Sequence, residues 1–180
     1  MLISKVIFTF IFVYLHNYIF IIVSGEGNEK LDTNRPSSKE KIPGIEEKRG
    51  SIRKSMKHAW EGYRKYAFGK DELLPVTERW NNNWGVTLID SLDTLYIMGM
   101  VEEFQEARDY LININFNQTI PGYHTSLFES VIRVLGGLLG AYDLSGEEIF
   151  LEKAKEVGDS LFLCFDHPSG VPYGFIDINK

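Results

Sequence analysis

Acidic side chains lie at helical spacing inside two otherwise apolar segments of this 180-residue chain. In the first, Asp90 and Asp93 are three residues apart, so a helix places both carboxylates on one face. Like charges at that spacing repel each other unless they are solvated, share a cation or accept hydrogen bonds from a neighbouring element. The surrounding Leu, Ile, Tyr and Met residues argue against full solvation. The pair is therefore a candidate for ligand binding, with acids that face solvent or cap a neighbouring element as the alternative.

Glu129 is the acid of the second segment, and its context supports two interpretations. Ser126 followed three residues later by Glu129 is a capping box, and Arg133 one turn further on is an ion-pair partner for Glu129. In that interpretation Glu129 is structural. In the other, Glu129 is a carboxyl at a helix N-terminus that faces a cavity and, when protonated, donates a proton to a leaving group. Arg133 would then tune its acidity or hold substrate.

The elements that must position these groups are predicted to be helices joined by short connections. Apolar residues recur at helical spacing, and Ser51 is a candidate N-cap while Gly69 and Gly99 end helices. The predicted helices cover residues 51–68, 86–98, 102–114, 127–142 and 147–165, followed by a turn at 166–170 and an extended segment at 173–178. Short connections favour antiparallel helix neighbours, so the predicted fold class is all-α.

Three glycines interrupt the helix that carries Glu129 and Arg133. Gly136, Gly137 and Gly140 each cost about 1 kcal/mol relative to Ala in a helix interior. Their presence predicts a close approach of another helix or loop to this one.

Composition limits the function classes. A net charge of −6 argues against a nucleic-acid partner, which would demand a basic face. The chain is 44% hydrophobic and 13% aromatic, enough for a packed core. Its single cysteine, Cys164, cannot close an internal disulfide. Four aromatic residues, Trp60, Tyr63, Trp80 and Trp84, are able to stack on sugar rings, but helical spacing is more typical of core positions.

Residues 1–25 are predicted to be a signal anchor that spans a membrane, or else a cleaved signal peptide. Lys5 precedes an almost uncharged apolar run, Val6–Val23, whose length fits both. The positive charge before the run favours a cytoplasmic N-terminus, with the rest of the chain in the lumen. The small residues Val23-Ser24-Gly25 also fit a cleavage site. Both alternatives place the body of the protein in the secretory pathway.

Residues 26–50 are predicted to be a flexible stem, and residues 51–180 the folded part. The stem is rich in Glu, Lys, Ser, Gly and Pro and has few large apolar side chains to offset the entropy of ordering. Further along, Asn117-Gln118-Thr119 is a sequon for N-glycosylation, which agrees with a lumenal location.

Several runs of residues, in order along the chain, resemble the class I α-1,2-mannosidases of glycoside hydrolase family 47. The resemblance spans residues 57–180, and the motifs that carry it are Lys57-His58-Ala59-Trp60-Glu61-Gly62-Tyr63, Ile89-Asp90-Ser91-Leu92-Asp93-Thr94-Leu95, Phe128-Glu129-Ser130-Val131-Ile132-Arg133, Leu144-Ser145-Gly146-Glu147-Glu148-Ile149-Phe150 and Pro168-Ser169-Gly170-Val171-Pro172.

The resemblance implies a fold, a reaction and roles for the candidate residues. The family fold is an (α/α)7 barrel, a toroid of helical hairpins with acids that project into a central cavity. A bound Ca²⁺ contacts the terminal mannose of a high-mannose N-glycan, and the α-1,2 linkage is hydrolysed with inversion, which needs one carboxyl as acid and another as base. Glu129 then corresponds to the general acid with Arg133 beside it. Asp93, with Asp90 close behind, corresponds to the substrate-binding acids of the cavity.

The sequence also departs from the family pattern. The family domain is several times longer, so the chain corresponds to a partial barrel truncated after roughly the first third. The chain lacks the family's general-base candidates, its calcium ligand and its usual disulfide pair. The calcium ligand is expected beyond Lys180, and Cys164 is not assigned to the disulfide pair. The resemblance implies a single-pass type II membrane protein of the endoplasmic reticulum or Golgi whose catalytic part is lumenal, although this chain alone is expected to be inactive.

Two other hypotheses remain beside a mannose-trimming enzyme. One is a mannosidase-like protein that recognises glycans in endoplasmic-reticulum-associated degradation, and the other is an inactive helical fragment. The run Leu144–Phe150 is more similar to the trimming enzymes, which favours the first hypothesis.

Overall fold

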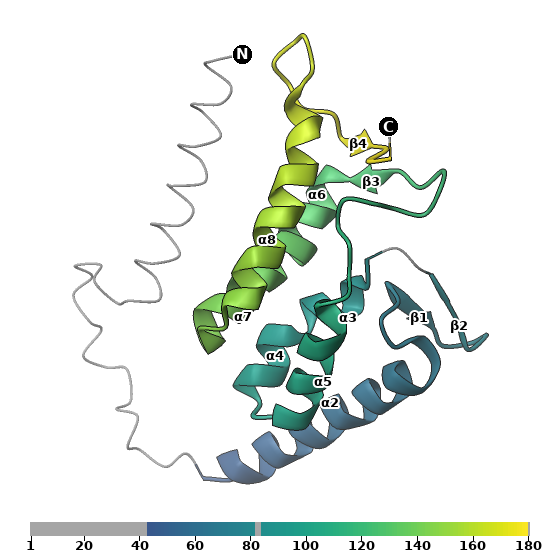
Figure 1. Ribbon diagram of the computed structural model, residues 1–180. Helices are drawn as coiled ribbons and strands as arrows, with labels where there is room; N and C mark the ends of the chain where they lie inside the picture. The colour runs from purple at the N-terminus through teal and green to yellow at the C-terminus, as the bar shows by residue number, and fades with distance from the viewer. Residues whose placement is uncertain (1–42, 82–83, 180) are drawn as a thin grey trace, which may run out of the picture. The chain divides into compact units, whose positions relative to one another are not determined.

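The structure, a computed structural model, describes residues 43–81 and 84–179 (Figure 1). The chain divides into a unit of residues 1–49 and a unit of residues 50–180, and the second unit carries the candidate site. The predicted anchor, residues 1–25, and most of the predicted stem lie outside the described residues. Within the described residues, no helix combines the length and apolar character that crossing a bilayer requires.

The longest helix starts earlier than the sequence predicted. Helix α2 runs from Ile45 to Ala67, so Ser51 lies inside it and the predicted N-cap at Ser51 is wrong. Residues Glu46 and Glu47 in the first turn favour this earlier start, because acids stabilise the N-terminal end of a helix. The end of α2 agrees with the prediction, since Gly69 has a φ of 75° just beyond it.

A break at Ser91 divides the second predicted helix. The structure has α3 (Val86–Asp90) and α4 (Leu92–Ile97), and the Ser91 hydroxyl donates a hydrogen bond to the Thr87 carbonyl at 2.6 Å. A Ser side chain that bonds back to the helix backbone in this way is associated with bends. Asp90 therefore lies at the C-terminal end of α3 and Asp93 in the first turn of α4.

The remaining predicted helices are present with shifted ends. They are α5 (Val101–Leu111), α6 (Leu127–Glu129), a π-helix η1 (Ser130–Leu135), α7 (Gly136–Ser145), α8 (Glu148–Leu161) and a 3-10 turn η2 (Phe162–Phe165). The fourth predicted helix is thus continuous but contains a π-helical stretch that the periodicity did not predict.

Two pairs of short antiparallel strands join the helices. Strands β1 (Glu72–Leu74) and β2 (Arg79–Asn81) form a hairpin, and β3 (Thr125–Ser126) pairs with β4 (Phe175–Ile176). The β4 pairing accounts for the extended segment predicted near the end of the chain. The all-α prediction is confirmed for the architecture, and these strands are small additions to it.

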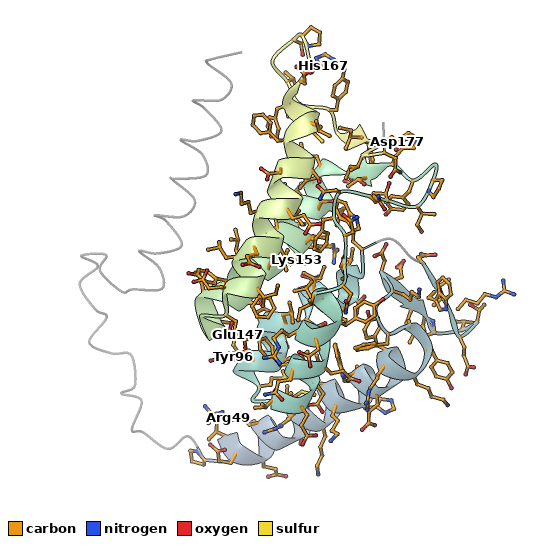
Figure 2. All side chains as sticks on the ribbon, viewed as in Figure 1. Arg49, Tyr96, Glu147, Lys153, His167 and Asp177 are labelled. Carbon is orange, nitrogen blue, oxygen red and sulfur yellow. The ribbon has the colours of Figure 1, made fainter. Side chains whose placement is uncertain are left out.

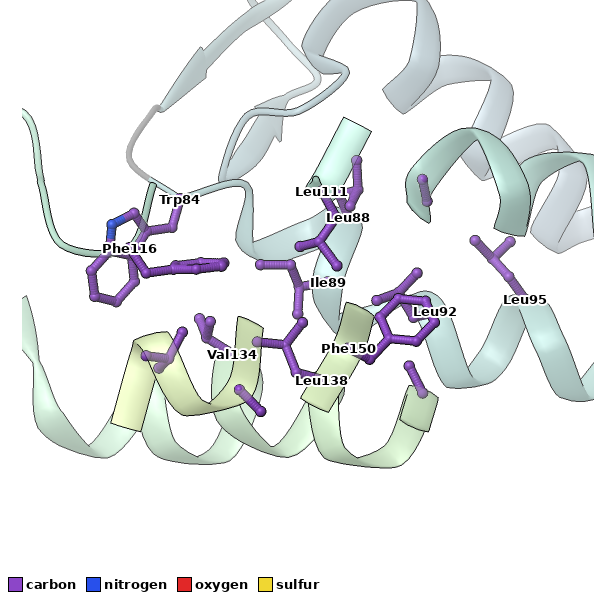
Figure 3. Close-up of a cluster of buried hydrophobic side chains, with 14 of the residues drawn as sticks. Trp84, Leu88, Ile89, Leu92, Leu95, Leu111, Phe116, Val134, Leu138 and Phe150 are labelled. Carbon is purple, nitrogen blue, oxygen red and sulfur yellow. The ribbon is translucent and has the colours of Figure 1, made fainter. Parts of the chain in front are cut away.

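One hydrophobic core holds the helices of the second unit together. Helix α7 packs between α8 on one side and α3 and α4 on the other. Figure 3 shows Ile89 of α3 opposite Leu138 of α7, with Val134 and Phe150 beside them, and all four side chains are almost completely buried. Burial of one such side chain contributes about 1.5–3 kcal/mol. This core fixes α3 and the η1–α7 segment relative to each other.

Candidate functional site

Arg133 joins Glu129 and Asp90 into one cluster. Its Nε donates to Oε2 of Glu129 at 2.6 Å, and its Nη1 donates to Oδ2 of Asp90 at 3.1 Å. Glu129 and Arg133 come from one continuous helical segment, whereas Asp90 comes from α3, 43 residues away from Arg133. We call these three residues the acid–arginine triad.

Ser126 fixes the start of the helical segment that carries Glu129. Its backbone is extended (φ −75°, ψ 122°), and its hydroxyl oxygen accepts a hydrogen bond from the Glu129 N–H at 3.4 Å. This is the first half of the predicted capping box. The second half is not formed in the described residues, because the Glu129 carboxylate accepts from Arg133 and makes no return bond to the Ser126 N–H. The hydrogen-bond partner of the carboxylate is thus Arg133 rather than the backbone at the start of its own helix.

Arg133 itself lies in the π-helix, Ser130–Leu135. Short π-helical stretches in α-helices are uncommon and often occur at functional sites. Within this stretch Ser130 and Val134 are buried while Arg133 is exposed, so the helix presents the guanidinium on its outer face. The π-helix is a feature that no pattern in the sequence indicated.

The triad is accessible to solvent. The exposed fractions of the three side chains are 51% for Glu129, 47% for Arg133 and 43% for Asp90. The hydrogen bond to Glu129 and the charge of Glu129, followed by the charge of Asp90, raise the pKa of the Arg133 guanidinium, so it remains a cation throughout the working pH range. Exposed ion pairs of this kind contribute only about 0–1 kcal/mol to stability. The carboxylates keep acceptor positions that a ligand hydroxyl can occupy.

Asp93 has different partners from Asp90. Its Oδ1 accepts from the N–H of Thr94 at 2.5 Å and from the Thr94 hydroxyl at 3.1 Å. It is half-buried on α4 and makes no ion pair within the described residues. The structure thus brings Glu129, Arg133 and Asp90 into contact and leaves Asp93 with its own neighbour.

The described residues do not form a metal centre. They contain no group of three or more His, Cys, Asp or Glu side chains that fits around a metal ion. A calcium ligand beyond Lys180 stays a prediction.

The predicted sugar-stacking aromatics are mostly core residues. Trp60, Tyr63 and Trp84 are at most 4% exposed, which removes them as stacking surfaces. Trp80 on β2 is 48% exposed, and the Lys70 ammonium lies 4.5 Å from the centre of its ring.

The sequon residue Asn117 lies in a loop held by α8. Its Oδ1 accepts from the Ser160 hydroxyl at 3.0 Å, and its Nδ2 donates to Oε1 of Glu156 at 3.4 Å. The same Glu156 oxygen accepts from the Phe116 N–H at 2.7 Å. Lys153 of α8 (Figure 2) pairs with Oε2 of Glu156 at 3.0 Å and donates to the Ile114 carbonyl. We call Lys153, Glu156 and Ser160 the α8 clamp.

The α8 clamp was not predicted from the sequence. Lys153 and Glu156 have the three-residue spacing of a helical ion pair, which was the only available indication. Their burial and their contacts with a loop about 40 residues earlier depend on tertiary packing, which the spacing does not reveal.

Residues 55–180 match the family model described as Glycosyl hydrolase family 47. A mannosyl-oligosaccharide 1,2-alpha-mannosidase from Arabidopsis thaliana is 44% identical over 160 residues, which cover 87% of this chain and 28% of that protein. An endoplasmic reticulum mannosyl-oligosaccharide 1,2-alpha-mannosidase from Rattus norvegicus is 45% identical over 144 residues, which cover 78% of this chain and 21% of that protein.

A solved structure shows the same relationship at the level of the fold. The alpha-1,2-mannosidase from Trichoderma reesei is 32% identical, with a TM-score of 0.70 over 74% of this chain and 31% of that one. The chain therefore spans only about a quarter of the length of the relatives named above. Its fold corresponds to a portion of a family 47 (α/α)7 barrel, as predicted.

Proposed function

Because the chain belongs to glycosyl hydrolase family 47, we propose that it forms the first part of the catalytic domain of a mannosyl-oligosaccharide 1,2-α-mannosidase. The proposed reaction removes α-1,2-linked mannose from high-mannose N-glycans. The observation that carries the proposal is the family match over residues 55–180, the region that contains the whole acid–arginine triad.

In the proposed mechanism Glu129 is the general acid. It protonates the glycosidic oxygen as the bond to the leaving sugar breaks, while a water attacks the anomeric carbon from the opposite face. Arg133 orients the Glu129 carboxyl through the bond at 2.6 Å and binds sugar hydroxyls with its remaining N–H groups. Asp90 and Asp93 accept hydrogen bonds from those hydroxyls. The carboxyl that activates the water comes from outside the triad.

Ca²⁺ is proposed as the cofactor. When bound, it would orient the hydroxyls of the terminal mannose. The resemblance to family 47 is what suggests a calcium ligand beyond Lys180. Dialysis against a chelator should then abolish activity and added Ca²⁺ should restore it. Full activity in the chelator would remove Ca²⁺ from the proposal.

The proposed location is the membrane of the endoplasmic reticulum or Golgi, with residues 1–25 as a type II anchor and residues 51–180 in the lumen. In microsomes, residues 51–180 should resist added protease. Asn117 should carry an N-glycan, seen as a mobility shift that peptide-N-glycosidase removes and that Asn117→Gln lacks. Digestion of residues 51–180 in intact microsomes would contradict the lumenal location.

The enzymatic proposal is tested by mannose release from a high-mannose glycan, with the protein expressed from its complete transcript. Glu129→Gln should lower kcat by about 10²–10⁴-fold, the range typical of lost general acid catalysis. Glu152→Gln is the matched control, because Glu152 is an exposed Glu on α8. Proton NMR of the first product should show the inverted, β anomer of mannose.

The same assay separates the alternatives. Undiminished hydrolysis by Glu129→Gln would remove Glu129 as the acid. Glycan binding without mannose release would favour the recognition protein, and the absence of both would favour the inactive fragment.

A further inference from the structure

Helix α7 approaches the end of α3 so closely at Gly137 that no larger residue fits there. A Cβ atom built on Gly137 would lie 2.8 Å from the Ile89 carbonyl oxygen and 3.2 Å from the Ile89 carbonyl carbon. Real Cβ atoms essentially never approach another atom to less than 3.0 Å, and the nearest atom here is backbone that has no side-chain freedom to move aside. A side chain at position 137 must therefore push the two elements apart.

The other two glycines of this segment are less restricted. A Cβ on Gly140 would lie 3.9 Å from the Asp93 Cβ, an ordinary van der Waals contact. A Cβ on Gly136 would lie 3.4 Å from the Val131 carbonyl oxygen of the preceding π-helix, so its nearest neighbour is in its own helical segment. The close approach to α3 is thus specific to Gly137.

The Gly137 contact adjoins the acid–arginine triad on both sides. Ile89 directly precedes Asp90 on α3, and Gly137 lies four residues after Arg133. Ile89 is fully buried among core side chains and cannot swing outward without disturbing the core. The separation of the two backbones at Gly137 therefore sets how far the Asp90 carboxylate lies from the Arg133 guanidinium.

We propose that Gly137 is a positioning residue of the mannose-binding site, which it keeps in order by holding Asp90 within reach of Arg133. The inference rests on the proposed function. Glu129 and Arg133 belong to one helical segment, so their bond at 2.6 Å does not depend on α3. The bond of Arg133 to Asp90 at 3.1 Å joins two elements and is the one that a wider separation breaks. Arg133 then turns wholly to Glu129, and Asp90 loses its fixed orientation toward the sugar hydroxyls.

Gly137→Ala is the first test, measured as steady-state mannose release by the protein from its complete transcript. It should lower kcat/KM by roughly tenfold, since displacement of a binding group by a fraction of an ångström has effects of this order. Gly140→Ala and Gly158→Ala are the matched controls, because each replaces a helical Gly with Ala without a close contact. Both controls should stay within about twofold of the wild type, well short of that loss.

A combination of variants separates positioning from general loosening of the fold. In the Asp90→Asn background, Gly137→Ala should cause little further loss, because the group it displaces no longer carries a charge for Arg133. Independent structural damage would instead make the two losses multiply. Multiplied losses would overturn the proposal.

The length of the acid at position 90 gives a second test, because Asp90→Glu should change kcat/KM in opposite directions with Gly and with Ala at position 137. With Gly137 in place, Asp90→Glu should lower kcat/KM, since the longer side chain overshoots the fixed distance. With Ala at 137, Asp90→Glu should raise kcat/KM relative to Gly137→Ala alone, because the longer side chain spans the wider gap. If Gly137→Ala fails to fold, Asp90→Glu with Gly137 intact still decides, and unchanged activity overturns the proposal.

Failure of the proposed function gives a different result from failure of the positioning role. A wild-type protein that releases no mannose contradicts the enzymatic proposal, and the spacing is then measured in the crystal structure of Gly137→Ala. An Arg133–Asp90 distance that stays near 3.1 Å in that variant overturns the positioning role whatever the activity.

Discussion

The acid–arginine triad and the α8 clamp both pair a carboxylate with a cation at hydrogen-bond distance, but they differ in exposure and in what else the carboxylate accepts. The triad side chains are 43–51% exposed, whereas Lys153 and Glu156 are 14% and 22% exposed. Glu156 accepts from a backbone N–H, a side-chain amide and a lysine, while Glu129 accepts from Arg133. One Glu holds a loop in place, and the other leaves acceptor positions open to a ligand.

The difference shows why residue type and spacing alone do not separate a structural ion pair from a candidate site. Glu129 and Arg133 are four residues apart, and Lys153 and Glu156 are three apart, so both pairs look alike in the sequence. Exposure and additional partners distinguish them.

The two glutamates should differ most in their effect on stability. Glu156→Ala leaves the Phe116 N–H without its acceptor and removes one of the two acceptors of the Lys153 ammonium, which should lower the free energy of unfolding by about 1–3 kcal/mol. Glu129→Ala removes only an exposed pair and should cost no more than about 1 kcal/mol. Urea denaturation of both variants, with Glu152→Ala as the control on α8, measures the difference. Equal losses at positions 129 and 156 would contradict the assignment of separate roles.

Ser126→Ala should have an intermediate effect. It removes the N-cap acceptor of the Glu129 N–H and should lower the free energy of unfolding by about 1 kcal/mol, as for other Ser caps. Ser126→Asp restores an acceptor at this position and should recover most of the loss in the same denaturation measurement. A Ser126→Asp protein no more stable than Ser126→Ala would show that the cap makes no contribution.

Asp90→Asn should have a smaller effect on stability. It breaks an exposed ion pair with Arg133 and should change the free energy of unfolding by no more than about 0.5 kcal/mol. The change should shrink further in 1 M salt, which screens exposed charges. Glu156→Ala, by contrast, should keep most of its cost in salt, because its pair is half-buried. A salt-insensitive loss above that range for Asp90→Asn would place Asp90 among the structural residues.

The smallest expected effect is a pH dependence on the α8 side of the molecule. Burial raises the pKa of the Cys164 thiol in η2, so the folded state favours the protonated form. This contribution to stability is fully present below the pKa of the unfolded thiol and is lost as the pH rises through the folded pKa. Denaturation midpoints should therefore fall slightly more steeply above about pH 8.5 in the wild type than in Cys164→Ala. Equal pH slopes of the denaturation midpoints in the two proteins would contradict this contribution of Cys164.

The helices and the Glu129–Arg133 pair were predictable because they depend on local periodicity. The pair needs only helical spacing, and the ends of helices at Gly69 and Gly99 follow from the freedom of glycine to adopt a positive φ. The Asp90–Arg133 bond, across 43 residues, depends on how two helices pack and was not predictable. Neither was the early start of α2, where Ser51 had the residue type of a cap without being one.

The break at Ser91 and the π-helix at Ser130–Leu135 were not predicted, for a related reason. Both change the backbone inside a segment whose apolar residues keep a helical pattern on either side. The sequence offered no reason to prefer Asp90 over Asp93 as the partner of Arg133. The break at Ser91 supplies such a reason, because it ends α3 at Asp90 and starts α4 before Asp93.

The π-helix η1 also sets the rotation about the helix axis between α6 before it and α7 after it. Each residue of an α-helix advances the side-chain direction by about 100°. If the same six residues, 130–135, were wound as an ordinary α-helix, everything downstream would rotate relative to Ser126 by roughly 100°. Gly137 would then no longer lie opposite Ile89, and a bulky neighbour would occupy its place. The π-helix therefore sets the angle about the helix axis between the direction of Glu129 and that of Gly137. It allows Glu129 to face the triad while Gly137 faces Ile89.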